Sequence, residues 1–171
     1  MPEAMSIATA TRAGLPATRM VLLKAFDERG FVFYTNFESR KGEELKANPR
    51  ASLLFHWKSL QRQLRIEGAV ETVSAAEADA YFATRPRGAQ IAAWASPQSQ
   101  AYGERGELEQ LNREAESRFA EAAAVPRPPF WSGYRVVPEL FEFWEERLFR
   151  LHDRLVYRRA EQGWRTERLY P

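Results

Sequence analysis

Runs of branched and aromatic residues, separated by short polar turns, dominate the first 73 residues. Such runs are typical of β-strands, and the breaks between them fall at Gly14, at residues 27–30 and at Lys58-Ser59. We therefore expect antiparallel strands with short connections. The predicted strands cover residues 6–11, 18–26, 31–35, 51–57 and 61–73.

A short helix is predicted between the third and fourth of these strands. Ser39 can cap its first turn, and Glu43 and Glu44 place acids near its start, where the helix dipole favours them. Asn48-Pro49 then ends the helix, because proline cannot continue it.

The middle of the chain, at about residues 74–124, is predicted to be a helical insert. Ser74 and Glu77 have the spacing of a capping box, and Pro86 interrupts the helix that they begin. Two further helices are expected at about residues 89–95 and 106–124. The last of them carries an apolar stripe that we expect to pack into the core, formed by Leu108, Leu111, Ala115 and Phe119.

Strand-like runs return after the prolines of residues 126–129. They cover residues 134–137, 140–144, 154–159 and 164–169. The last two runs are joined by a predicted hairpin turn at residues 161–163. Strands that enclose a helical insert predict one α+β domain over residues 1–171, mainly β, built as a closed or partly closed antiparallel barrel with helices packed outside it.

Length and composition agree with a single globular domain. The chain has 171 residues, of which 44% are hydrophobic and 28% charged. No apolar run approaches the roughly 18 residues that cross a bilayer, and the N-terminus lacks the order of a signal peptide. We therefore expect no membrane association and a cytoplasmic location.

The chain lacks cysteine, which excludes disulfides, thiolate metal sites and thiol nucleophiles. Its two histidines, His56 and His152, are too few for a typical zinc or iron centre, so we predict no metal site. Difficult redox chemistry would therefore require an organic cofactor.

Positive charge is concentrated in residues 12–65, which contain eleven Lys or Arg against five Asp or Glu, although the net charge of the chain is only +2. A solvated face, a phosphate-bearing small ligand or a nucleic acid could each account for this excess. The sequence has no basic tail or recognised nucleic-acid motif, so no nucleic-acid partner is predicted.

Basic residues near the N-terminal strands form two candidate sites. Arg19 and Lys24 flank an apolar strand, but their odd spacing puts them on opposite faces, so a shared ligand would require a bulge or different parts of that ligand. Arg40 and Lys41 open the short helix, whose free amide groups favour an anion. These two cations are a candidate phosphate cradle, and two solvated cations are the alternative.

Two more candidate sites lie further along the chain. Tyr81 and Arg85 are four residues apart and share a helix face, as either a phosphate site or a surface pair. Arg150, His152 and Arg154 alternate, so in an extended segment all three project from one side. Three basic groups on one face repel one another unless an anion or acid lies opposite, which leaves a ligand site and a solvated edge as alternatives.

Motifs over nearly the whole chain match one known family in order and spacing. They are RMVLLK (19–24), FYTN (33–36), SRK (39–41), NPR (48–50), RPR (85–87), QS (98–99), EFW (142–144), RLHDR (150–154) and RLYP (168–171). Together they resemble the pyridoxamine 5'-phosphate oxidase family. The resemblance implies a homodimeric split β-barrel that binds FMN in clefts at the subunit interface. It also implies oxidation of pyridoxamine 5'-phosphate or pyridoxine 5'-phosphate to pyridoxal 5'-phosphate, with oxygen reoxidising the flavin and yielding hydrogen peroxide.

The resemblance implies two sets of site residues, carried over position by position. The FMN-binding set is Arg19, Met20, Val21, Leu22, Leu23, Lys24, Tyr34, Thr35, Arg40, Lys41, Gln63, Gln98, Ser99, Trp144 and Arg154. The substrate-binding set is Lys24, Tyr81, Arg85, Arg150 and His152. Within these sets, Arg40 and Lys41 would neutralise the FMN phosphate, whereas Arg150 and His152 would border the pyridine ring as the catalytic pair.

The chain departs from the family pattern at three places. Ala89 stands where the family commonly has a serine that donates to the substrate phosphate, and Glu145-Glu146 stands where it often has Gln-Gly. The chain also begins close to the first strand, without the N-terminal helical segment usual in the family. Two alternatives therefore stay open: a related FMN oxidase acting on another cyclic substrate, such as a phenazine precursor, and a noncatalytic flavin or pyridoxal phosphate binding protein.

Overall fold

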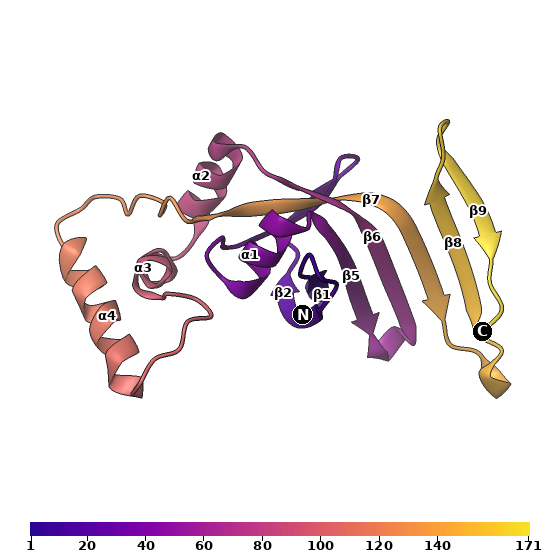
Figure 1. Cartoon of the computed structure of the whole chain (residues 1–171), viewed down its shortest axis with the longest axis horizontal. Helices are drawn as coiled ribbons and strands as arrows, with labels where there is room; N and C mark the ends of the chain where they lie inside the picture. Colours follow the sequence, from indigo (N-terminus) through magenta and orange to yellow (C-terminus); the bar gives the residue numbers. More distant parts are fainter. The chain divides into compact units, whose positions relative to one another are not determined.

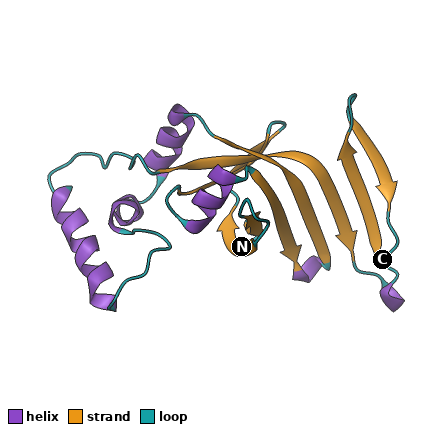
Figure 2. Ribbon diagram, viewed as in Figure 1, coloured by secondary structure: helices purple, strands orange, loops and turns teal.

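The computed structural model describes residues 1–171 apart from the side chain of Arg105, and it divides into two compact units. The first unit comprises Met1–Phe33, Glu44–Glu71 and Tyr134–Pro171, and the second comprises Tyr34–Glu43 and Thr72–Gly133. Strands supply most of the first unit, whereas helices supply most of the second (Figure 2).

Strands and helices follow one another in the order shown by the labels of Figure 1. They are β1 (Ala4–Ala10), β2 (Pro16–Leu22), β3 (Ala25–Asp27), β4 (Gly30–Asn36), α1 (Arg40–Ala47), β5 (Arg50–Trp57), the 3-10 turn η1 (Lys58–Leu60), β6 (Arg62–Thr72), α2 (Ala75–Thr84), α3 (Arg87–Ala95), α4 (Arg105–Arg118), β7 (Trp131–Glu145), the 3-10 turn η2 (Leu148–Arg150), β8 (Asp153–Arg159) and β9 (Trp164–Arg168).

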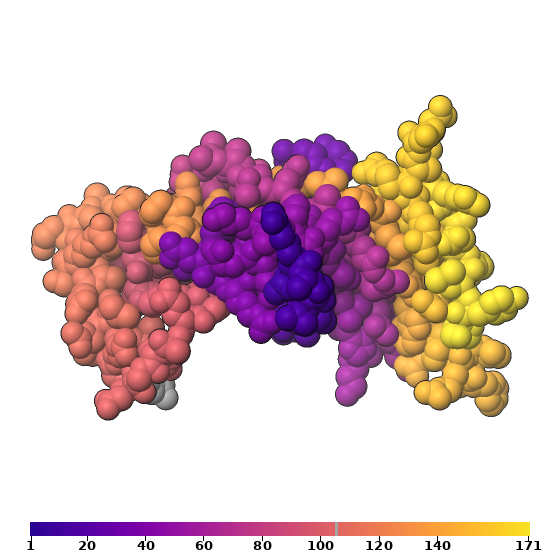
Figure 3. All heavy atoms as spheres, in the orientation of Figure 1, coloured from indigo at the N-terminus to yellow at the C-terminus, as the bar shows by residue number. Residues whose placement is uncertain are grey.

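The strands of the described chain form one sheet in the order β2-β1-β5-β6-β7-β4-β3, with β8 paired to β7 and β9 paired to β8. The neighbouring pairs β1–β2, β5–β6 and β7–β8 are antiparallel, and the β7–β8 register sets Trp144 opposite Arg154. In the space-filling view, the yellow C-terminal segment lies along the orange segment that contains β7 (Figure 3). The predicted α+β class, with a mainly antiparallel sheet, is confirmed.

Each unit has its own apolar core. Burial alternates along β1, where Met5, Ile7 and Thr9 point inward, as expected for a strand with one face on the core. In the second unit, α2, α3 and α4 contribute to a cluster that includes Phe82 and Trp131. Two cores are consistent with the division of the chain between sheet and helices.

The helix starts follow the local sequence signals. Ser74 caps α2 as predicted, because its hydroxyl accepts a hydrogen bond from the Glu77 amide at 3.1 Å. Helix α1 lies where Ser39 and Asn48-Pro49 predicted it. The last hairpin turns at Gly163, whose φ of 77° is in the region that favours glycine, and the Ala160 amide donates to the Gly163 carbonyl.

Two strand boundaries differ from the predictions. The run 18–26 is split into β2 and β3, because the Leu23 amide bonds to Glu3 and the Lys24 amide bonds to Val32, so the chain changes partners at this point. The runs 134–137 and 140–144 join into the single strand β7, which continues through a proline. Gly68 allows this close approach, since a Cβ there would lie 1.9 Å from the Val137 carbonyl oxygen.

Helix α4 is shorter than predicted and ends at Arg118. The Phe119 amide is shared between the carbonyls of Ala115 and Glu116, which is the tightening typical of a helix end. The predicted stripe is only partly buried, because Leu108 is 40% exposed while Ala115 and Phe119 lie in the core. The apolar face is therefore buried near the end of the helix and exposed near its start.

Candidate active site

A polar cluster lies at the start of α1 in the second unit. The buried Ser39 hydroxyl donates to the Asn36 carbonyl at 2.6 Å. The Lys41 ammonium donates to the Ser39 hydroxyl at 3.1 Å and to the Gln98 amide oxygen at 2.7 Å, and Thr35 donates to the same Gln98 oxygen at 3.3 Å. The two oxygens that accept these hydrogen bonds are uncharged. The cluster therefore joins three predicted FMN residues into one group suited to an anion.

Stacked aromatic rings form a second group in the same unit. The Tyr34 and Tyr81 rings lie 3.9 Å apart at 12°, and Trp131 continues the stack 5.3 Å from Tyr34 at 8°. The Arg85 guanidinium lies over the Trp131 ring at 4.7 Å and over the Phe82 ring at 5.4 Å. Tyr81 and Arg85 thus belong to one group of side chains, but they do not share a helix face as predicted, because α2 ends at Thr84 and Arg85 is extended.

Arg85 is electrostatically unusual among the described residues. Its Nη1 atom is buried and has no hydrogen-bond partner. Burial lowers the pKa of the Arg85 guanidinium, and the charge of Tyr81 opposes that effect. A buried donor left unpaired costs about 1 to 3 kcal/mol, so this group has bonding capacity that the described residues do not use.

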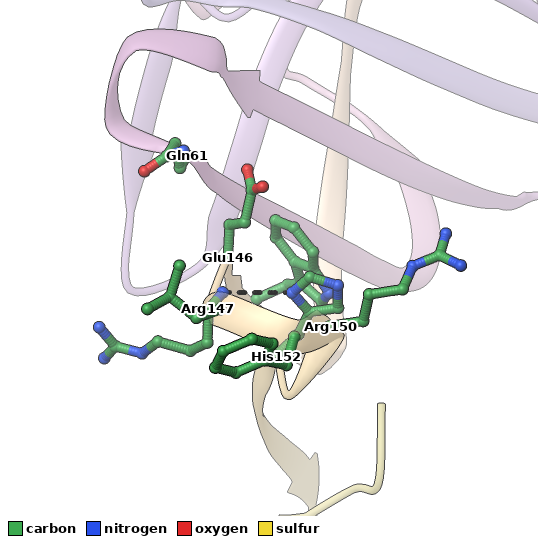
Figure 4. A pocket seen from close by; sticks show the side chains of 8 residues that line it. Gln61, Glu146, Arg147, Arg150 and His152 are labelled. Atoms are coloured by element: carbon green, nitrogen blue, oxygen red, sulfur yellow. Dashed lines mark hydrogen bonds between the residues drawn. The ribbon is translucent and has the colours of Figure 1, made fainter.

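In the first unit, a pocket of about 650 Å³ lies beside η2. Its lining residues are Gln61, Trp144, Glu146, Arg147, Leu148, Phe149, Arg150 and His152. The His152 ring lies 4.7 Å from Trp144, and its Nδ1 accepts a hydrogen bond from the Arg147 amide at 3.2 Å (Figure 4). The predicted catalytic pair, Arg150 and His152, therefore lines one pocket, and Arg150 extends to the opposite side from Arg147 (Figure 4).

The backbone conformation that brings Arg150 and His152 to this pocket differs from the one considered in the sequence. Residues 150–154 are not one extended segment, because Arg150 belongs to η2 and the strand begins only at Asp153. Phe149 and Arg150 have φ values of 57° and 63°, in the left-handed region that residues with a Cβ rarely adopt. The predicted alternation of Arg150, His152 and Arg154 along one face is wrong.

Left-handed backbone also marks residues outside η2. Among the described residues other than glycine, Gln61 and Ser99 complete the set with positive φ, at 52° and 72°. Gln61 lines the η2 pocket, and its carbonyl accepts from the Glu146 amide at 2.9 Å. Strained backbone of this kind gathers at functional sites. Gln61 was missed in the sequence, where no glycine or turn motif marked it.

Arg154 is held by a buried carboxylate rather than aligned with His152. Glu142 is 6% exposed; it accepts from Arg154 Nε at 2.7 Å and also pairs with Arg65. The hydrogen bond from Arg154 is the largest cause of the lowered pKa of the Glu142 carboxyl, and the same bond raises the pKa of Arg154. The Arg154 guanidinium also donates to the Tyr170 carbonyl at 3.0 Å.

Three other predicted site residues of the first unit have defined surroundings. Arg19 pairs with the buried Glu44 at 3.1 Å and donates to Thr9 at 2.5 Å. Lys24 lies between β2 and β3, outside the regular strand in which its spacing was considered. Gln63 stands opposite His56 in the β5–β6 ladder.

The predicted site residues are divided between the two units. The first unit contains Arg19, Met20, Val21, Leu22, Leu23, Lys24, Gln63, Trp144, Arg150, His152 and Arg154. The second contains Tyr34, Thr35, Arg40, Lys41, Tyr81, Arg85, Gln98 and Ser99. Among the described residues there is no group of three or more His, Asp or Glu that could hold a metal ion.

Two departures from the family pattern have defined positions. Ala89 lies in the first turn of α3. Glu145 pairs with Arg62 at 3.2 Å and with Arg147 at 3.4 Å, whereas Glu146 lines the η2 pocket. Of the two adjacent acids, one is thus engaged in ion pairs and the other is a pocket residue.

Comparison with known proteins assigns the chain to a family. A family model described as pyridoxamine 5'-phosphate oxidase matches residues 1–128, and one described as the pyridoxine 5'-phosphate oxidase C-terminal dimerisation region matches residues 131–171. The chain belongs to the pyridoxamine 5'-phosphate oxidase family. Within that family, it is 59% identical over 170 residues to the pyridoxine/pyridoxamine 5'-phosphate oxidase of Caulobacter vibrioides, covering 99% of this chain and 76% of that protein.

Two solved structures place the fold. PhzG from Burkholderia lata, crystallised with tetrahydrophenazine-1-carboxylic acid, has a TM-score of 0.92 at 35% identity over 99% of this chain and 83% of PhzG. A pyridoxamine 5'-phosphate oxidase-related, FMN-binding protein from Nostoc punctiforme has a TM-score of 0.77 at 19% identity, over 99% of this chain and 89% of that protein. Identity to PhzG is far below that to the Caulobacter oxidase, which does not favour the phenazine alternative. The predicted split-barrel fold is confirmed.

The residues of this family member fit an FMN phosphate. Lys41 is placed by neutral oxygens at the start of a helix, where the amide groups and dipole attract an anion. Arg40 opens the same helix.

No helix in the described part of the chain is long and apolar enough to cross a membrane.

Proposed function

We propose that this chain oxidises pyridoxine 5'-phosphate and pyridoxamine 5'-phosphate to pyridoxal 5'-phosphate, with FMN as cofactor and oxygen as the final electron acceptor. The observation that carries the proposal is the 59% identity to a pyridoxine/pyridoxamine 5'-phosphate oxidase across 99% of this chain. The aligned region covers the positions of all the predicted site residues rather than a single motif.

Lys41 and Arg40 would hold the phosphate of FMN, with Thr35 and Gln98 completing the polar cluster. Trp144 and Arg154 would also contact the cofactor, and Glu142 holds the Arg154 guanidinium in place. When bound, FMN would supply the acceptor for the hydride of the substrate and would reduce oxygen to hydrogen peroxide. For the amine substrate, water would supply the aldehyde oxygen and the nitrogen would leave as ammonia.

Lys24, Tyr81 and Arg85 would bind the substrate phosphate. Arg85 supports this role because its Nη1 has no partner among the described residues, and a phosphate would be its counterion. A fixed phosphate restrains the rest of the substrate, and such positioning is a large part of enzymatic catalysis.

Arg150 and His152 would border the pyridine ring of the substrate. The Nδ1 atom of His152 accepts from the Arg147 amide, so the neutral imidazole carries its proton on Nε2. That arrangement leaves Nε2 as a donor for a polar substituent of the ring. Arg150 would add a positive charge beside the ring.

A homodimer in the cytoplasm is part of the proposal. The match of residues 131–171 to a C-terminal dimerisation region supports self-association. The apolar side chains of η2 also support it, since Leu148 is 81% exposed and Phe149 88% exposed.

Oxygen uptake by the FMN-loaded chain tests the proposal. We expect uptake with pyridoxine 5'-phosphate that stops when FMN is removed and returns when it is added. A chain that binds FMN but consumes no oxygen with either B6 phosphate would be a noncatalytic binder. Uptake with a dihydrophenazine carboxylate alone would support the alternative oxidase.

A further inference from the structure

We propose that Trp131 is a positioning residue for the substrate phosphate, because its indole ring supports the guanidinium of Arg85. Trp131 belongs to neither predicted site set. The inference rests on the proposed function, in which Arg85 binds that phosphate.

Two aromatic rings and the backbone conformation of Arg85 fix the position of its guanidinium. Its Cζ lies 4.7 Å from the centre of the Trp131 ring and 5.4 Å from that of Phe82. The residue follows the end of α2 with φ −72° and ψ 145°, the extended conformation that the following Pro86 favours. The side chain therefore leaves the helix in a fixed direction and lies on the indole.

Trp131 is itself firmly held. It is 7% exposed; its carbonyl accepts from Arg127 Nη1 at 2.7 Å, and its amide donates to the Pro128 carbonyl at 3.0 Å. On β7, two residues later, Gly133 makes room for the stack, because a Cβ there would lie 2.8 Å from the Tyr34 ring. The ring that supports Arg85 thus belongs to a rigid aromatic array.

Arg85 differs from other buried or partly buried arginines because no carboxylate among the described residues pairs with it. Three of them are paired with carboxylates at 3.0 Å or less: Arg127 with Asp79, Arg135 with Asp27 and Arg154 with Glu142. Among the described residues, no carboxylate pairs with Arg85, and its Nη1 lacks any hydrogen-bond partner. Aromatic faces attract a guanidinium without cancelling its charge. Trp131 can therefore hold Arg85 in place while leaving it available to an anion.

Replacing Trp131 should weaken binding of the substrate phosphate, because the Arg85 guanidinium would no longer be held in place. Trp131→Leu should raise the Kd for pyridoxal 5'-phosphate about tenfold in the FMN-loaded chain, measured by equilibrium dialysis, and Trp131→Phe should raise it less. The KM for pyridoxine 5'-phosphate should rise in parallel while kcat changes little, since the lost interaction is made equally in the ground and transition states.

A double-mutant cycle separates positioning from general damage to the fold. On an Arg85→Met background, Trp131→Leu should change the Kd by less than about twofold, because the guanidinium that it positions is gone. Trp94→Leu is the matched control: the Trp94 ring carries Arg118 at 4.6 Å in the same unit, and its loss should leave the Kd within about twofold of wild type.

The outcomes distinguish this inference from the function on which it rests. Equal effects of Trp131→Leu with and without Arg85, or an unchanged Kd in Trp131→Leu and Trp131→Phe, would overturn the positioning role alone. A wild-type chain that neither binds nor oxidises a B6 phosphate would overturn the proposed function, and this inference with it.

Discussion

Replacing Glu142 by glutamine should destabilise the first unit more than replacement of any exposed acid on the same strand. The side chain of Glu142 is 7% exposed and pairs with two guanidiniums, those of Arg65 and Arg154. Glutamine keeps the shape of the side chain but can accept from only one of them, and without charge. The change therefore isolates the electrostatic part of the interaction.

The expected loss is about 2 to 3 kcal/mol in the free energy of unfolding. One charge-assisted hydrogen bond contributes about 1.5 to 3 kcal/mol, and removing one partner of a fully buried ion pair costs about 3 to 5 kcal/mol. The lower range applies here because the arginines are 37% and 28% exposed and regain water. For a chain of this length, the midpoint of thermal unfolding should fall by roughly 4 to 12 °C.

The loss should also depend on pH. The bond to Arg154 holds the pKa of Glu142 below its usual value of 4.5, so the carboxylate contributes its full stabilisation above that pH and loses it as the pH falls through the lower, folded-state pKa. The difference between wild type and Glu142→Gln should thus be constant at neutral pH and shrink under acid conditions below about 4.5.

Thermal unfolding followed by circular dichroism, at one protein concentration and several pH values, measures this difference. Glu139→Gln is the control, because Glu139 lies on the same strand and its pair with Arg50 is exposed, with an expected effect of about 1 kcal/mol or less. A Glu142→Gln midpoint no lower than that of Glu139→Gln, or a difference that does not shrink in acid, would refute the reasoning.

Three further predictions concern the cofactor, the catalytic pair and the assembly. Lys41→Ala should weaken FMN binding by about 1.5 to 3 kcal/mol in a fluorescence titration, whereas Lys46→Ala, in the last turn of the same helix, should not; equal affinities would remove the phosphate assignment. Arg150→Ala should lower kcat/KM for pyridoxine 5'-phosphate at least roughly tenfold with FMN still bound, and Arg158→Ala, at an exposed position of β8, should leave it unchanged; normal turnover in Arg150→Ala would reject the catalytic role. Light scattering should give about twice the chain mass of 19.8 kDa, and a monomer that binds FMN tightly would contradict the dimer.

Much of the fold could be predicted from the sequence because its signals are local. The alternation along β1, the cap at Ser74 and the Asn48-Pro49 stop each act within a few residues. The errors came where distant backbone decides the outcome. The pattern predicts two separate runs where β7 is continuous. Gly68 of β6 lets the backbone of β7 pass close to it there, and the local pattern does not show that contact.

In the candidate site too, local features could be predicted from the sequence and contacts between distant residues could not. Spacing grouped Tyr81 with Arg85, and both side chains lie against the aromatic rings, although Arg85 follows the end of α2 and is not helical. The bond between Lys41 and Gln98 joins residues 57 apart, so only the resemblance to a family could suggest it. No glycine or asparagine marks the left-handed backbone at Phe149 and Arg150, so the sequence leaves an extended segment over residues 150–154 open, and the structure excludes it.

The most direct test of the proposed oxidase is the stoichiometry of its products. FMN-loaded chain, supplied separately with pyridoxine 5'-phosphate and pyridoxamine 5'-phosphate in air, should form pyridoxal 5'-phosphate and hydrogen peroxide in equal amounts, both followed in the same sample. Unphosphorylated pyridoxine should react far more slowly, because Arg85 and its partners would lack their anion. Peroxide without pyridoxal 5'-phosphate, or neither product from FMN-bound chain, would contradict the account.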